Sequence, residues 1–246
     1  MDKLLYVAMS GASNMMTAQA THSNNLANVD TQGFKEDFVQ ARSMPMFGPG
    51  YGSRVYAETE QPGTNFAPGV LKQTDNPLDL AIKNDGFFTV VDAQGQETFT
   101  RDGGFFVDVN GFMRNNNGDI VMGNAGPMII PPYESIVVGA DGGVSIRPLG
   151  QGAETIVQVD RIKLVNPPIT ELSKGEDGLF RRKDGLYEPP AADVEVVGGF
   201  LEGSNVNPVH SLLSIMSLSR QFEMSMKVMK EAEEMDQSTD RLIRAS

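Results

Sequence analysis

Apolar residues recur with helical spacing at both ends of the chain and with strand-like spacing in the middle. From residue 4 to residue 28 they follow a heptad, alternately four and three residues apart, and the same spacing returns from residue 215 to about residue 232. All 14 prolines lie between Pro45 and Pro208, so residues that break helices are concentrated between the two ends. The pattern predicts helices over 4–28 and 207–246, with a strand-rich domain inserted between them. Asn207 is the expected N-cap of the second helix, with Pro208 at its first position.

The two terminal stripes are narrow and leave each helix little apolar surface to bury. Gln19 and Ser23 interrupt the first stripe, and Asp236 and Thr239 weaken the second. Helices of this kind are usually stabilised by a partner helix. We therefore expect the terminal helices to pair as a coiled-coil-like layer that also forms an assembly interface. The apolar heptad residues assigned to this interface are Leu5, Met9, Ala12, Met16, Leu26, Ile215, Leu218, Phe222 and Met229.

The middle of the chain alternates short strand-like runs with turn dipeptides. Strands are predicted at 78–82, 86–91, 97–101 and 105–109, with less regular ones near 179–181 and 194–197. Asp-Gly and Asn-Gly pairs accept the positive φ of tight hairpin turns. Such turns are predicted at Asp92–Gly95, Asp102–Gly104, Asn110–Gly111, Asn117–Gly118 and Asp141–Gly143. The fold class is therefore α+β, with an inserted antiparallel β domain that forms a compact meander or small barrel.

This pattern divides the chain into three regions. Residues 1–33 and 207–246 form the terminal helical assembly domain, 34–76 an extended connecting region, and 77–206 the β domain. The first helix ends in an asparagine-rich stretch followed by Gly33, where we expect a turn with positive φ.

Composition excludes several classes of function. The formal net charge is −12, which argues against binding to nucleic acid or directly to anionic lipid. Because the chain has no cysteine, disulfides, thiolate catalysis and cysteine-type zinc sites are excluded. No apolar run approaches the ~20 residues that cross a bilayer. The N-terminus does not resemble a standard signal peptide, so we expect any export to occur without cleavage of a signal peptide.

Candidate catalytic groups are few and badly placed. Only His22 and His210 could act as a base at neutral pH, and each lies at the edge of a terminal helix. Four aspartates sit beside Gly or Asn in turns, where a short side chain bonds its own backbone: Asp102, Asp108, Asp119 and Asp141. The oxygen-rich run 108–119 lacks the spacing and the closing Glu of a calcium loop. We therefore expect no enzyme activity, no catalytic residues, no cofactor and no metal.

The stretch from residue 24 to residue 35 closely resembles the signature of bacterial flagellar axial proteins, the rod and hook family. The residues that carry it are Asn24, Asn25, Leu26, Ala27, Asn28, Thr31, Gly33, Phe34 and Lys35. Further stretches similar to the family are Gly69–Thr74, Asn76–Ile82, Gly86–Val90, Phe99–Gly103, Leu201–Val206 and Arg220–Glu223. Together they extend the resemblance over nearly the whole chain.

The resemblance implies a structural subunit of the flagellar basal body. Its partners would be copies of itself, other rod proteins and the flagellar type III export apparatus, which would deliver it without a cleaved signal to the periplasmic rod. The terminal helices would form an inner layer, with the β domain outward. The opening 1–12 is most similar to proximal rod members; a distal rod or short hook-like subunit is the alternative. A secreted glycan-binding or glycan-cleaving domain is disfavoured because the chain has no Trp and only 7% aromatic residues.

Overall fold

The computed structural model describes the backbone of residues 2–39, 41–45, 55–59, 63–151 and 155–245, and the side chains of 8–39, 63–151, 155–235 and 237–238. The chain folds into two compact units. The helical unit comprises Met1–Val29, Glu36–Asn65 and Val206–Ser246, and the β unit comprises Asp30–Lys35 and Phe66–Asn205. Each unit therefore combines segments that are far apart in the sequence.

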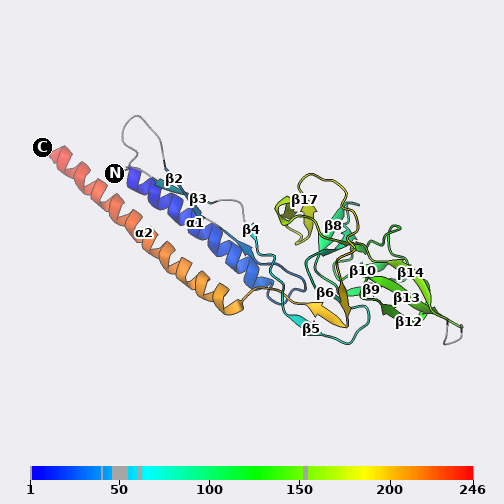
Figure 1. Cartoon of the computed structure of the whole chain (residues 1–246). Coiled ribbons are helices and arrows are strands. Elements are labelled where there is room, and N and C mark those ends of the chain that lie inside the picture. Colours follow the sequence, from blue (N-terminus) through cyan, green and yellow to red (C-terminus); the bar gives the residue numbers. More distant parts are fainter. Residues whose placement is uncertain (1, 40, 46–54, 60–62, 152–154, 246) are drawn as a thin grey trace. The chain divides into compact units, whose positions relative to one another are not determined.

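The helical unit is built on two long terminal helices. Helix α1 spans Asp2–Ala27 and helix α2 spans Pro208–Ala245, and they run antiparallel, side by side (Figure 1). Both predicted helices are thus confirmed. The predicted N-cap is confirmed as well, because Asn207 Oδ1 accepts hydrogen bonds from the backbone N–H groups of Val209 and His210, both at 3.1 Å. Along α2, Lys230 Nζ lies 3.9 Å from Glu234 Oε1, an i,i+4 pair that modestly supports the helix.

Four short strands complete the helical unit. Strand β1 (Asp37–Phe38) pairs with β4 (Gly63–Thr64), and β2 (Ala41–Pro45) pairs with β3 (Val55–Thr59), both antiparallel. Strand β3 packs along α1. Within the described parts of 34–76, every strand has at most five residues, as expected for a region rich in Gly and Pro.

The β unit contains an eight-stranded antiparallel sheet, hereafter the main sheet, in the order β16-β17-β8-β7-β11-β10-β9, with β15 also paired to β7. Its strands are β7 (Phe87–Val91), β8 (Glu97–Thr100), β9 (Phe105–Val107), β10 (Met113–Asn115), β11 (Ile120–Val121), β15 (Leu164–Val165), β16 (Leu172–Lys174) and β17 (Phe180–Arg182). A 3₁₀ turn, Ile169–Glu171, precedes β16.

A three-stranded sheet and two ladders complete the β unit. The sheet consists of β12 (Tyr133–Val138), β13 (Gly143–Pro148) and β14 (Val157–Arg161). Strand β5 (Leu71–Gln73) pairs with β19 (Phe200–Glu202), and β6 (Leu80–Ile82) pairs with β18 (Val196–Gly198). The two ladders join the first and last strands of the unit, which more than 110 residues separate.

Most predicted strands and turns are confirmed. Strands β6, β7, β8 and β9 fall within the four predicted runs, and β17 and β18 overlap the two predicted later. Four predicted turns connect antiparallel neighbours, and in each the glycine has positive φ: Gly95 (81°), Gly111 (85°), Gly118 (90°) and Gly142 (80°). These turns can be predicted from neighbouring residues alone, because only glycine adopts such φ values without strain.

The predicted hairpin turn at Asp102–Gly104 is wrong. Strands β8 and β9 on either side of it lie apart in the main sheet, with β7, β11 and β10 between them. The segment instead runs beside the start of β6, where Leu80 N donates to Gly103 O at 2.9 Å and Asp79 bridges to Gly104. Glycine is needed at 103 for close approach rather than for a turn, because a Cβ there would overlap the Leu80 carbonyl oxygen.

The interior of the β unit contains two apolar clusters. Its larger cluster joins the main sheet to the three-stranded sheet and includes the fully buried Leu80, Phe88, Val90, Met113, Val121, Met128 and Val144. A second cluster consists of Phe87, Phe99, Val165, Leu172 and Phe180, with Phe66 packed against it. In the part of the chain that the structure describes, no helix is long and apolar enough to cross a membrane.

Replacing Gly103 tests the close approach. We expect Gly103→Ala to destabilise the protein by about 3 kcal/mol or more, because the added methyl group must displace backbone. Gly198→Ala is the matched control, since the nearest atom to its added Cβ is Leu80 Cδ2 at 3.9 Å and its φ is not positive. The measurement is urea unfolding of the full chain followed by circular dichroism. Equal midpoints for the two variants would contradict the assignment.

Candidate functional site

The signature residues after helix α1 are fixed by a glycine turn inside the β unit. Gly33 has φ +66°, which confirms the predicted positive φ. Its backbone N–H donates to Glu202 O at 2.8 Å. A Cβ at this position would overlap the backbone of Arg101 and Asp102, so glycine is required for space as well as for conformation.

Two residues later, the Lys35 ammonium group is buried and hydrogen-bonded. The side chain is 1% exposed, and Nζ donates to Glu202 Oε1 at 2.6 Å and to Ala67 O at 2.9 Å. An unpaired charge at such a depth would be strongly unfavourable. The lysine of the signature is therefore an internal anchor for this segment.

Glu202 binds a second buried cation, Arg101. Its Oε2 accepts from Arg101 Nη1 at 3.0 Å, and its Oε1 also accepts from Gly69 N at 2.9 Å. Arg101 Nη2 donates to Asn84 O at 2.9 Å, whereas the buried Arg101 Nε has no hydrogen-bond partner. We call Lys35, Arg101 and Glu202 the ion cluster. One carboxylate thus binds two cations from distant parts of the sequence.

The electrostatics of the ion cluster follow from its burial. Desolvation lowers the pKa of Lys35 from its ordinary value, while the hydrogen bond and the charge of Glu202 act in the opposite direction. The positive charge of Arg101 lowers the pKa of Lys35 further. Glu202 is the main group that opposes this lowering of the Lys35 pKa, and the charge of Asp85 acts in the same direction as Glu202.

Other contacts fix Phe34 and the backbone of Lys35. Lys174 Nζ lies 3.8 Å from the centre of the Phe34 ring and donates to Lys35 O at 2.7 Å. Asn205 N donates to Phe34 O at 3.3 Å, and Asn205 Nδ2 donates to Ala67 O at 3.0 Å. Residues 34 and 35 are therefore bound by main-chain and side-chain contacts from three other segments of the β unit.

Asn25 has the corresponding role in the helical unit. Its side chain is fully buried; Nδ2 donates to Asp37 O at 2.6 Å, and Oδ1 accepts from Asp37 N at 3.0 Å. An amide that satisfies one backbone donor and one acceptor of the same residue replaces a strand neighbour. It fixes strand β1 against the end of α1.

The remaining signature residues are less buried. Asn28 Nδ2 donates to Asn24 O at 3.0 Å, which supports the end of α1. Leu26 is half-buried, and Ala27 and Thr31 are exposed. Hence the signature includes two buried polar anchors, Asn25 and Lys35.

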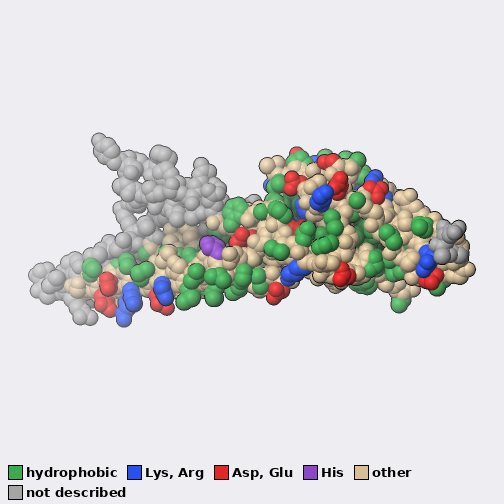
Figure 2. Space-filling view, turned by 60° about the horizontal axis from the view of Figure 1, so that its bottom comes forward, with side chains coloured by type: hydrophobic (Ala, Val, Ile, Leu, Met, Phe, Trp, Pro, Cys, Tyr) green, Lys and Arg blue, Asp and Glu red, His purple; other side chains and the backbone are tan. Residues whose placement is uncertain are grey.

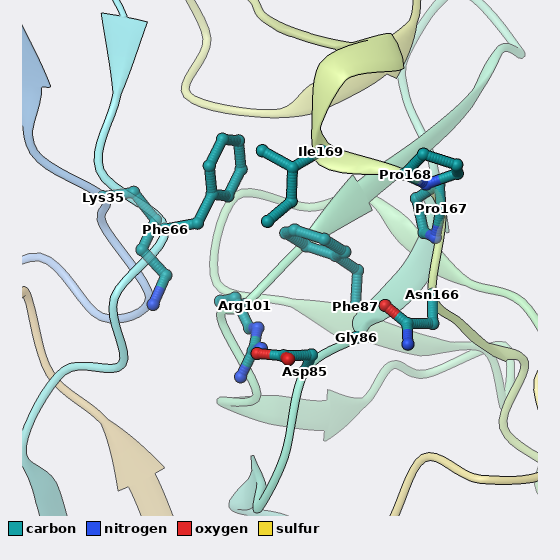
Figure 3. Close-up of a pocket in the computed structure, with 10 residues that line it drawn as sticks. All are labelled: Lys35, Phe66, Asp85, Gly86, Phe87, Arg101, Asn166, Pro167, Pro168 and Ile169. Carbon is teal, nitrogen blue, oxygen red and sulfur yellow. The ribbon is translucent and has the colours of Figure 1, made fainter.

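A pocket of about 310 Å³ opens beside the ion cluster (Figure 3). Phe66, Phe87 and Ile169 form apolar walls, and the charged ends of Lys35 and Arg101 lie at one side. None of the ten residues drawn there is a serine, cysteine or histidine. The two cations are bound to Glu202, an arrangement that stabilises the fold, and the exposed Asp85 also lines the pocket.

The other candidate chemical groups lie elsewhere. His22 and His210 face each other in the helical unit, with ring centroids 6.4 Å apart. Asp108 and Asp141 pair with Arg114 and Arg161 at 2.8 and 2.9 Å. Among the described residues, no group of three or more His, Asp or Glu is arranged to hold a metal ion.

The predicted interface residues fall into three groups. Ala12 is buried, and Leu26, Ile215, Leu218, Phe222 and Met229 are half-buried. Met9 and Met16 are 57% and 59% exposed. Leu5 lies outside the residues whose side chains the structure describes.

The covered side of α1 is displaced from the predicted stripe by one residue at alternate positions. Ala8, Met15 and His22 are half-buried where the heptad had positions 9, 16 and 23. Met15 Sδ accepts from Ser225 Oγ on α2 at 3.9 Å. Met9 and Met16 consequently lie beside the helix–helix contact rather than within it.

The opposite side of α2 is exposed and apolar, and we call it the outer face. Its large hydrophobic residues are Val209, Leu212, Leu213, Met216, Met224 and Met235. A shallow groove of about 320 Å³ runs between Leu213 and Met224. Figure 2 shows hydrophobic side chains gathered along this part of the surface, with charged groups toward the C-terminal end. Exposed apolar patches of this kind are typical of interaction surfaces.

Two site residues, Glu202 and Arg101, were missed by reasoning from the sequence. Both lie in stretches that resemble the family, Leu201–Val206 and Phe99–Gly103, but neither stretch indicates that its charge is buried. The signal available was the excess of charge inside apolar strand segments, which normally exclude it.

Gly33 offers a test of the anchored turn. We expect Gly33→Ala to lower unfolding free energy by about 3 kcal/mol or more, because a positive φ and a backbone overlap act together. Gly178→Ala is the control: its φ is +79°, but nothing lies within 4 Å of an added Cβ, so only ~1 kcal/mol should be lost. Chemical denaturation of the full chain measures both. Similar losses would show that the close approach is unimportant.

The raised pKa of Asp102 predicts a pH dependence of the protein's stability. Burial raises its pKa to about 6, and the charges of Asp79 and Asp119 act in the same direction. The folded state therefore keeps this proton when the unfolded state has lost it, so stability should fall as pH rises from about 4 to 6.

Replacing Asp102 with Asn should remove this pH dependence. We expect Asp102→Asn to stabilise the protein by about 2 kcal/mol at pH 8 and to have little effect near pH 4. Thermal unfolding at the two pH values measures it. A constant difference between variant and parent would contradict the assignment to Asp102.

Comparison with known families covers both ends and the centre of the chain. The model described as "Flagella basal body rod protein" matches residues 5–35. "Flagellar hook protein FlgE/F/G D1 domain" matches 81–146, and "Flagellar basal body rod FlgEFG protein C-terminal" matches 197–242. The first match contains Asn25 and Lys35, and the last contains Glu202.

Similar curated proteins align over nearly the whole chain. The flagellar basal-body rod protein FlgF of Escherichia coli is 36% identical, with 95% of each chain covered. FlgF of Salmonella typhimurium is 34% identical, with all of both chains covered. The flagellar basal-body rod protein FlgG of Buchnera aphidicola is 31% identical, with 97% of this chain and 98% of that protein covered. The chain therefore belongs to the flagellar basal-body rod protein family and is a structural subunit of the flagellar rod.

Proposed function

We propose that this chain is a proximal rod subunit that polymerises through its terminal helices to form part of the shaft between rotor and hook. The observation that carries the proposal is the apolar outer face of α2, which the chain itself leaves exposed. A structural subunit needs such a surface, because removing apolar area from water supplies most of the free energy of association.

The terminal helices are suited to repeated packing. Met9 and Met16 on α1 and the methionines of the outer face are exposed on the two helices. Methionine side chains are flexible and fill irregular gaps, so one surface can pack against several neighbours in an assembly. The predicted interface residues that are half-buried between the helices, such as Leu218 and Phe222, would hold the helix pair in shape. Coiled-coil-like supercoiling of these helices in the rod remains part of this proposal.

The alternative is a distal rod or short hook-like subunit. Relatives named FlgF and FlgG both align along the chain: FlgF of Escherichia coli is 36% identical and FlgG of Buchnera aphidicola 31%. The difference in identity favours the proximal position. Locating the protein by labelled electron microscopy of basal bodies would separate the two positions.

The proposal extends to location and partners. The subunit would leave the cytoplasm through the flagellar type III export apparatus without signal cleavage and assemble in the periplasm with copies of itself and other rod proteins. The net charge of −12 supports partners other than nucleic acid or anionic lipid. A mechanical role without catalysis agrees with the structural use of the ion cluster.

Met216→Asp tests the outer face. We expect loss of swimming in a complemented null strain, because a charge in the packed rod would cost several kcal/mol at every copy. The purified variant should keep its thermal unfolding midpoint, since Met216 is already 46% exposed.

Gln237→Asp is the matched control, because it adds the same charge at an exposed polar position of α2. It should swim normally. Secreted protein levels and electron microscopy of basal bodies accompany both variants. Normal rods containing the Met216 variant would show that the outer face is not an assembly surface.

A further inference from the structure

Residues 196–205 occupy an unusual position in the β unit. They come last in its sequence, yet they pair with its first strands: β18 with β6 and β19 with β5. Gly203 N donates to Val70 O at 2.9 Å, and a Cβ at Gly69 would overlap the Gly203 carbonyl group. The segment is therefore closely packed against the beginning of the unit.

Glu202 is the centre of these contacts. Its carboxylate binds Lys35, Gly69 and Arg101, and its backbone oxygen accepts from Gly33. Four separate positions of the chain thus depend on one residue that is 1% exposed.

Without Glu202, the ion cluster would consist of two buried cations, and the nearby acidic residue Asp85 is exposed. Lys35 and Arg101 are 1% and 4% exposed, so water could reach them only if the surrounding structure opened. Removing one partner from a buried ion pair is strongly destabilising because it leaves an uncompensated charge. Arg101 directly follows β8 of the main sheet, and its guanidinium lies 5.4 Å from the centre of the Phe87 ring on β7. Opening at Arg101 would therefore disturb the main sheet.

We infer that Glu202 is a latch: the main sheet is stable only while residues 196–205 are bound and Glu202 neutralises Lys35 and Arg101. This segment follows every strand of the main sheet in the sequence. In a chain that becomes available from its N-terminus onward, the β unit therefore cannot close until residues 196–205 are available. The latch thus delays closure of the β unit until most of the chain is available.

Hydrogen exchange of the full chain distinguishes a latch from a local contact. In the parent protein, amides of β5, β6, β18 and β19 should exchange at the same rate as those of β7 and β8, as one cooperative unit. In Glu202→Leu, exchange in β7 and β8 should rise on the order of 100- to 1,000-fold. Glu202→Gln should give a smaller rise, about tenfold or more, in the same strands. Faster exchange confined to β5 and β19 would overturn the inference.

Two further variants separate the latch from general damage. Combining Lys35→Met, Arg101→Leu and Glu202→Leu removes all three charges and should restore slow exchange in β7 and β8 to within about tenfold of the parent. Glu195→Gln, immediately before the segment, is the control: its ion pair with Lys83 is more than half exposed, so this substitution should leave exchange unchanged. If the triple variant exchanged as fast as Glu202→Leu, the charges would not be the cause and the latch would be excluded.

Discussion

A buried carboxylate that binds two buried cations is the interaction on which the β unit depends. Glu202, Lys35 and Arg101 come from the end, the beginning and the middle of that unit, and all are at most 5% exposed. Charges at this depth are tolerated only when paired and hydrogen-bonded, so the three residues must be brought together whenever the unit folds. An apolar contact would tolerate small shifts in register, whereas this arrangement requires one specific alignment of β5 and β19. The specificity of the fold in this region therefore rests on electrostatics, and most of its stability rests on the surrounding apolar clusters.

The same segment that carries the family signature connects the two units. Asn25 is satisfied by Asp37 within the helical unit, and Lys35 by Glu202 within the β unit. Between them, Gly33 supplies a turn that no other residue could form in the available space. The chemical identity of these three residues explains why the signature is so restrictive: two positions require a buried polar group, and one requires no side chain.

A rod subunit must expose apolar surface before assembly and bury it afterwards. In the proposed assembly the outer face of α2 would be this surface, while the half-buried side of the same helix packs on α1. The two sides of one helix would thus have different tasks. The β unit, in contrast, buries its apolar residues in its own core and can be stable as a folded subunit before neighbours arrive.

Much of the fold could be predicted because its signals are local. Asn207 and Pro208 mark the start of α2, and glycines such as Gly95 and Gly118 mark hairpins, since capping and positive φ depend only on neighbouring residues. The heptad identified both helices, but it assigned Met9 and Met16 to the apolar stripe of α1, whereas the covered side contains Ala8 and Met15, one residue earlier. A periodicity of apolar residues identifies a helix, but it indicates only approximately which side of the helix is covered.

The tertiary structure alone decided the features that join distant segments. The sequence by itself determined an acidic, cysteine-free α+β chain with terminal helices, short strands and the signature of rod proteins. It did not show that Asp102–Gly104 runs beside β6, because a close backbone approach and a tight turn both select glycine. Nor did it show that Glu202 binds Lys35 and Arg101, because a charged residue in a strand is normally solvated, and only long-range packing determines whether it is buried and with which partner.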